Sequence, residues 1–179
     1  MEEVKKEQWL TWMAITTILI AVAATLSTFK GGGFSTRSLL NQTKASDQWA
    51  FYQSKSIKSY IYDLRRENLE IQVASLEKQK GNEDLIKKYK GLIADYYQKV
   101  KTYESEKEDI SKTAKGFENL RDESKLHSDK FGIGVIFLQI SILLSSIATL
   151  SKKKYVWICG LILGGIGIFY FIDGLLLFY

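Results

Sequence analysis

The amino-acid sequence predicts an all-α membrane protein in which three transmembrane helices accompany a long antiparallel coiled-coil hairpin, placed between the first and the second. Two long apolar runs contain no charged residue, and a third contains one. The region between the first two runs holds 20 of the 25 basic residues and 16 of the 20 acidic residues. The chain contains no proline, which suits long, uninterrupted helices.

Each apolar run is long enough to cross a bilayer. Residues 8–29 and 131–151 carry no charge, and residues 155–179 carry only Asp173. A bilayer core of about 30 Å needs roughly 20 apolar residues in a helix. We therefore divide the chain into an N-terminal tail with the first span (1–30), a soluble hairpin (31–130), a second span (131–151), a short basic loop (152–154) and a third span (155–179).

The ends of the first arm of the hairpin have clear sequence signals. Gly31–Gly33 predict a flexible break after the first span, and Ser35 or Thr36 can cap the helix that follows. Gly81 and Asn82 predict a turn, because glycine adopts turn conformations and asparagine caps helices. Two helical arms are therefore expected to pair on either side of residues 81–82.

Apolar residues recur in both arms at helical spacing. The second arm alternates spacings of four and three, which is a strong coiled-coil pattern. Its members are Tyr89, Ile93, Tyr96, Val100, Tyr103, Lys107, Ile110, Ala114 and Phe117, of which only Lys107 is charged. The first arm has a weaker pattern, consisting of Thr43, Ser46, Ala50, Gln53, Ile57, Tyr60, Leu64, Ile71 and Ala74.

The position of the turn also predicts the pairing register. In a packed antiparallel pair, the numbers of two facing residues should add up to about 160 to 163. This register places Phe117 near Ala45 and Trp49 near Ala114, so that large residues oppose small ones. It also places Asp95 opposite arginines of the first arm.

Small and hydroxyl-bearing residues recur along all three spans. Such stripes let helices approach closely in lipid. They include Ala14 and Ala21 in the first span, Ser141 and Ser145 in the second, and Gly160 and Gly164 in the third. Packing within one chain and association between chains both explain them.

The basic loop at residues 152–154 predicts the orientation. A short loop with three lysines stays in the cytoplasm, which places the N-terminus in the cytoplasm and the hairpin outside it. Asp173 then lies near the outer boundary of the bilayer core. We expect it to pair with Lys30 or Lys130, although an ionisable residue within a span is also a candidate functional group.

Residue types that bind metals or perform catalysis are scarce. Cys159 is the one cysteine and fits a packing role, and His127 is the one histidine. His127 has acidic neighbours but no second histidine, which favours a polar residue at a helix end over a metal or acid–base site. We expect no catalytic site, no metal and no cofactor. The charges of the hairpin interleave in sign, which argues against nucleic-acid binding.

One stretch of the hairpin carries a family resemblance. It reads Ser46-Asp47-x-Trp49-x-x-Tyr52-Gln53-x-Lys55-Ser56-x-Lys58 and follows a glycine triplet and a Ser-Thr pair. With the order of span, hairpin, span, basic loop and span, this pattern resembles the bacterial membrane-protein family catalogued as domain of unknown function 4337. The resemblance implies the bacterial inner membrane and implies no activity. The side chains in question form either the base of the hairpin or a docking surface for a partner chain: Asp47, Trp49, Tyr52, Gln53, Lys55 and Lys58.

Two functions fit these features. The first is a non-enzymatic structural or interaction protein of the inner membrane, either a homo-oligomer or an accessory subunit of a larger complex, whose partners are the lipid bilayer and further protein chains. The alternative is an oligomeric ion channel or transport component that uses Asp173 for charge selectivity. Because the spans contain only one ionisable residue and a two-helix hairpin offers no cleft, we favour the first.

Overall fold

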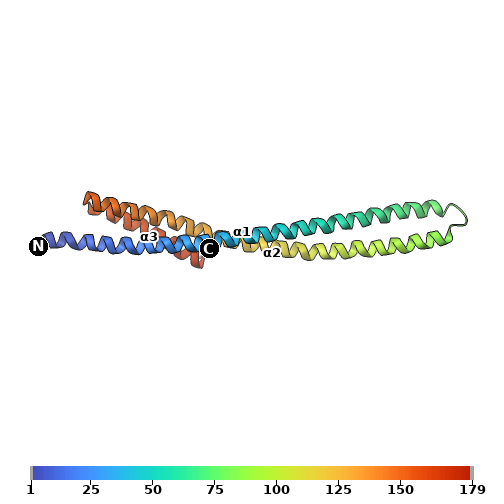
Figure 1. Cartoon of the computed structure of the whole chain (residues 1–179), viewed down its shortest axis with the longest axis horizontal. Coiled ribbons are helices and arrows are strands. Elements are labelled where there is room, and N and C mark those ends of the chain that lie inside the picture. Colours follow the sequence, from blue (N-terminus) through green and yellow to red (C-terminus); the bar gives the residue numbers. More distant parts are fainter. Residues whose placement is uncertain (1, 178–179) are drawn as a thin grey trace. The chain divides into compact units, whose positions relative to one another are not determined.

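A computed structural model describes residues 2–177 of the chain, and these residues form three α-helices (Figure 1). Helix α1 spans Glu2–Leu76, α2 spans Glu83–Ser151 and α3 spans Lys154–Leu176. No strand occurs within the described part of the chain. The all-α prediction is therefore confirmed. Each helix contains a segment that is long and apolar enough to cross a membrane.

The helices form two compact units. Unit 1 consists of Met1–Leu40 together with Leu120–Tyr179, and unit 2 consists of Asn41–Asn119. Unit 1 thus contains all three apolar runs, whereas unit 2 contains most of the charged residues. Helices α1 and α2 each contribute to both units.

The predicted break at Gly31–Gly33 is wrong, because α1 continues through all three glycines. The Thr36 hydroxyl donates to the carbonyl of Gly32 within the helix at 3.0 Å, so neither Thr36 nor Ser35 caps a new helix. Gly31 is buried, and a Cβ there would lie 3.0 Å from Cβ of Phe131 in α2. This glycine permits a close approach of two helices instead of a turn.

The predicted turn after the first arm is confirmed. Helix α1 ends at Leu76, and Gly81 has a φ of +94°, in the left-handed region that favours glycine. The carbonyl of Asn82 accepts a hydrogen bond from the backbone N–H of Ile86 at 2.9 Å, so Asn82 stands at the start of α2. Acidic residues follow in the first turn of α2, where they complement the helix dipole.

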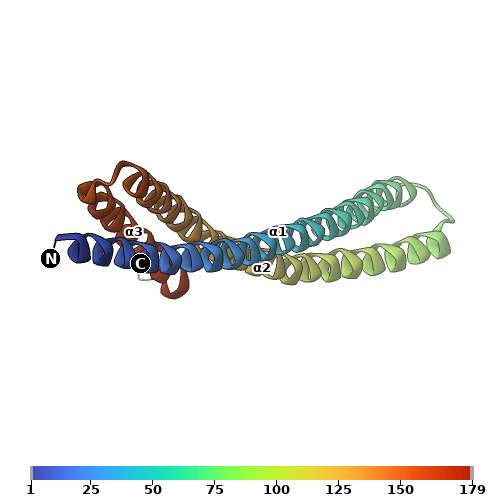
Figure 2. The same cartoon turned by 60° about the vertical axis from the view of Figure 1, so that its left-hand side comes forward.

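Within unit 2, the parts of α1 and α2 run side by side in opposite directions (Figures 1 and 2). We call residues 41–76 the α1 arm and residues 83–119 the α2 arm. Lys55 pairs with Glu106 at 2.6 Å, and the Ser59 hydroxyl donates to Glu104 at 2.8 Å. The residue numbers of these pairs sum to 161 and 163. The pairs agree with the predicted register.

Two details differ from that register. The indole N–H of Trp49 donates to Glu118 at 2.9 Å, one helical turn beyond the predicted Ala114. Asp95 pairs with Lys99 of its own helix at 2.9 Å. Of the two arginines expected opposite Asp95, Arg66 pairs along its own helix with Asp63 and Glu70. Neighbours on the same helix are always within reach, which explains why these charges do not need the opposite arm.

The two arms bury different kinds of residue. Every member of the predicted α2 pattern is buried or half-buried, which confirms that pattern as the contact face. Every member of the predicted α1 pattern is exposed, including Ile57 at 61% and Ile71 at 69%. The α1 arm instead turns a largely polar face toward the α2 arm. Its buried and half-buried members include Asn41, Ala45, Tyr52, Lys55, Ser59, Tyr62, Arg66 and Val73.

Unit 1 is packed around glycines of α3. Gly160, Gly164, Gly167 and Gly174 are buried. A Cβ on Gly164 would lie 2.8 Å from the Ser141 hydroxyl and 2.9 Å from Cδ1 of Ile20, so this glycine touches both other helices. The Ser141 hydroxyl donates to the carbonyl of Gly160 at 2.6 Å. The absence of side chains on α3 thus lets three helices share a narrow core.

Candidate functional site

The most deeply buried charge of unit 1 is Asp173, which is 1% exposed near the C-terminal end of α3. Its Oδ2 lies 2.7 Å from the ammonium nitrogen of Lys130 in α2. The predicted ion pair is therefore confirmed, with Lys130 as the partner. A carboxylate is unfavourable at the negative end of a helix dipole. The adjacent ammonium offsets that repulsion and joins α3 to α2.

His127 closes the same end of the bundle. Its Nδ1 lies 2.7 Å from the carbonyl oxygen of Gly174, and its ring stacks on Phe34 of α1 with centroids 4.3 Å apart. Because a carbonyl only accepts hydrogen bonds, Nδ1 carries the proton. The histidine thus connects all three helices. Across the described residues, no group of three or more His, Cys, Asp or Glu side chains is arranged to hold a metal.

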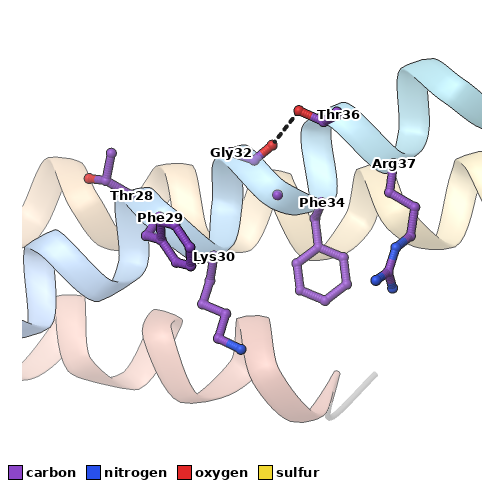
Figure 3. A pocket seen from close by; sticks show the side chains of 8 residues that line it. Thr28, Phe29, Lys30, Gly32, Phe34, Thr36 and Arg37 are labelled. Atoms are coloured by element: carbon purple, nitrogen blue, oxygen red, sulfur yellow. Dashed lines mark hydrogen bonds between the residues drawn. The ribbon is translucent and has the colours of Figure 1, made fainter.

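A groove of about 590 Å³ runs along α1 beside this cluster (Figure 3). Lys30, Phe34 and Arg37 point to the same side of the helix in that view. The guanidinium carbon of Arg37 lies 5.5 Å from the centre of the Phe34 ring. The remaining lining residues are Thr28, Phe29, Gly32, Gly33 and Thr36. We call this set the α1 groove; it combines two cations with aromatic surface.

The family stretch of the α1 arm has both half-buried and exposed members. Trp49, Tyr52 and Lys55 are half-buried, and Trp49 and Lys55 bond to the α2 arm as described above. The ring of Tyr52 lies 5.4 Å from the ammonium of Lys107. These three side chains contact the α2 arm. The other three members, Asp47, Gln53 and Lys58, are exposed.

Cations and tyrosines alternate along the contact between the arms. Lys55 lies 5.2 Å from the ring of Tyr103 of the α2 arm, and Lys99 lies 5.0 Å from the ring of Tyr62 of the α1 arm. A hydrogen bond from Lys107 lowers the pKa of the Glu104 carboxyl, and one from Ser59 lowers it further. This polar contact does not follow from the periodicity of the apolar residues in the sequence.

The opposite side of the α1 arm carries a regular stripe of four apolar residues and one asparagine, which we call the outer face. It consists of Ile57, Ile61, Leu64, Asn68 and Ile71, all exposed. Their spacings alternate four and three, which is the heptad pattern of a helix that packs against another helix. The amide of Asn68 donates to the carbonyl of Leu64 at 2.9 Å, in the middle of the stripe. Within unit 2 no helix covers this face.

The predicted helix-packing residues also have different roles. Ser141, Gly160 and Gly164 pack within the chain, as described above, and Ser145 is buried. Ala14 is exposed and Ala21 is half-buried. The buried side of α1 in unit 1 includes Met13 and Ile20, each one position before the predicted Ala14 and Ala21, together with Ala24 and Ser27.

Comparison with known protein families gives a match over most of the chain. The model of the family described as domain of unknown function DUF4337 matches residues 9–177. The match covers nearly the whole described chain and confirms the resemblance seen in the hairpin stretch. No curated protein and no solved structure matches the chain significantly.

Proposed function

We propose that this chain, which belongs to the DUF4337 family, is a non-enzymatic protein of the bacterial inner membrane that pairs with a second copy of itself. Unit 1 would hold the chain in the bilayer through its three apolar segments. Unit 2 would be an extramembrane coiled-coil hairpin. Two hairpins would associate through the outer face of the α1 arm.

An inverted polarity in the α1 arm carries this proposal. Lys55, Ser59 and Arg66 lie on the side that faces the α2 arm, whereas Ile57, Leu64 and the rest of the outer face are exposed. A helix of a self-sufficient domain buries its apolar face instead. Burying one isoleucine or leucine side chain contributes about 1.5–3 kcal/mol. The hairpin therefore has most to gain from a partner on the outer face.

The residues of the outer face favour a parallel pair of identical helices. In the heptad, Ile61 and Asn68 occupy a positions, and Ile57, Leu64 and Ile71 occupy d positions. A single asparagine at an a position fixes register and favours a defined oligomer, because it pairs with its own copy.

The flanking charges favour the same direction. Lys58 and Arg65 occupy e positions. These cations would oppose those of the other copy in an antiparallel pair. In a parallel pair, Arg65 would instead face Tyr60, which allows a cation–π contact. Two copies inserted in one bilayer with the same orientation are also parallel, so membrane anchoring and side-chain chemistry agree.

Disulfide cross-linking tests this pairing in membranes. With Cys159 replaced by serine, Leu64→Cys should give a cross-linked dimer under mild oxidation, because a disulfide needs Cα atoms within about 7 Å. Ser105→Cys is the matched control, since Ser105 is exposed on the α2 arm, away from the outer face. Selective cross-linking at Leu64 would support the proposal. Equal cross-linking at both positions, or none at Leu64, would overturn it.

The ion-channel alternative has less support. Asp173 is 1% exposed, and its partner Lys130 belongs to the same chain. A carboxylate that conducts ions must reach a water-filled path. Asp173 instead faces a packed contact between α2 and α3.

A further inference from the structure

We infer that the α1 groove binds the phosphate of an anionic phospholipid, with Lys30 and Arg37 as the cationic contacts. This inference rests on the proposed insertion of unit 1 in a bilayer. It does not depend on the pairing of hairpins.

The depth of the groove in the proposed bilayer favours a lipid as its ligand. Lys30 directly follows the uncharged run at residues 8–29, so it lies where the apolar core meets the headgroups. Phe29, next to it, is 77% exposed, as expected for a side chain in contact with acyl chains. Arg37 is seven residues further along, about 10 Å on the same face of the helix. A long side chain at each end can therefore reach one headgroup between them.

The charge of the groove selects an anion. Lys130, at the same end of unit 1, is paired with Asp173. Lys30 and Arg37 make no ion pair with any residue of the described chain, and none of the groove residues is acidic. Two cations on one side of a helix repel each other unless an anion lies between them. A phospholipid phosphate supplies that charge at this depth.

The shape of the groove leaves room for a headgroup. A Cβ at Gly32 or Gly33 would have no atom of the chain within 4 Å, so the floor of the groove is open. The Phe34 ring stacks on His127, and the guanidinium carbon of Arg37 lies 5.5 Å from the centre of the same ring. In Figure 3, Phe34 and Arg37 point to the same side of α1. The ring therefore gives the guanidinium a fixed position, which lowers the entropy lost when Arg37 binds a phosphate.

Lipid titration of the full chain tests the site. A short-chain phosphatidylglycerol is titrated into the chain in a neutral detergent, and the apparent Kd is measured by native mass spectrometry. Phosphatidylcholine and inorganic phosphate are titrated in parallel. We expect phosphatidylglycerol to bind more tightly than either. Lys30→Gln/Arg37→Gln should weaken that binding about thirtyfold, from roughly fivefold per cation near a headgroup layer.

Lys101→Gln is the matched control, because Lys101 is an exposed lysine of unit 2. An unchanged Kd in the double variant, or an equal loss in the control, would overturn the inference. Equal binding of inorganic phosphate would also overturn it, since it would indicate a small-anion site. Flotation with pure phosphatidylcholine vesicles separates the two proposals. Failure to float contradicts membrane insertion. A chain that floats, but that shows no preference for phosphatidylglycerol in the titration, contradicts only the lipid site.

Discussion

Gly167 of α3 lies so close to α2 that one added methyl group has no room. A Cβ at this position would lie 2.7 Å from Cγ and 2.9 Å from the backbone nitrogen of Leu138. A side-chain atom can rotate away, but a backbone atom moves only with its helix. Gly165 stands two residues earlier, and a Cβ there would have no neighbour within 4 Å. Gly167→Ala and Gly165→Ala therefore form a matched pair.

The two variants should differ in their free energy of unfolding by the cost of overpacking at Gly167. Both variants gain about 1 kcal/mol of helix propensity when glycine becomes alanine. Only Gly167→Ala also forces atoms into a filled core, which costs about 1–3 kcal/mol. Because the propensity gain is shared, the variants should differ by about 1–3 kcal/mol. For a chain of 179 residues, this difference corresponds to a separation in Tm of roughly 2–12 °C.

Thermal unfolding in one mild detergent, followed by far-UV circular dichroism at a fixed scan rate, measures this separation. The fixed rate matters because a Tm from irreversible unfolding depends on it. We expect Gly165→Ala at or above the wild-type Tm and Gly167→Ala below Gly165→Ala. Equal Tm values for the two variants would refute the close packing of α3 against α2.

Three further predictions concern other contacts. Asp173→Asn should lower the Tm, because it removes the carboxylate beside Lys130, and a double-mutant cycle with Lys130→Gln should reveal their coupling. Acid should weaken unit 2, because the folded protein lowers the pKa of the Glu104 carboxyl. The stability that this carboxylate contributes is complete above its ordinary pKa of 4.5 and is lost as the pH falls through the lowered pKa. Unfolding of wild type and Glu104→Gln as a function of pH measures this, and the variant should lose that part of the pH dependence. Ala114→Leu should destabilise by about 1–3 kcal/mol, since Ala114 is 0% exposed; an unchanged Tm would contradict its buried position.

Much of the helical architecture could be predicted because its signals are local. The absence of charge identified the three apolar runs, and Gly81 identified the turn through a backbone conformation that other residues avoid. The same residue type misled at Gly31–Gly33, where the helix continues. A glycine signals either freedom of the chain or close contact with a neighbour. Only the position of Phe131, about a hundred residues later, shows that Gly31 serves contact.

The faces of the α1 arm could not be assigned from the sequence for a different reason. Its apolar residues and its polar residues both recur at the heptad period, so periodicity alone does not say which set is buried. The usual assumption, that the apolar set faces inward, fails here. The partners of Lys55 and Ser59 lie in the α2 arm. Their position in the sequence gives no sign of this.

The outer face and the membrane anchor reinforce each other in the proposed dimer. A stripe of five residues is too short to hold two free helices together against the entropy of association. Copies anchored in one bilayer have already lost much of that freedom, and their effective concentration is high. Because polar residues of the α1 arm occupy the side that faces the α2 arm, Ile57 and Leu64 lie on the exposed outer face. Pairing should therefore follow the density of the chain in the membrane, and the hairpin alone, without its spans, should remain largely unpaired.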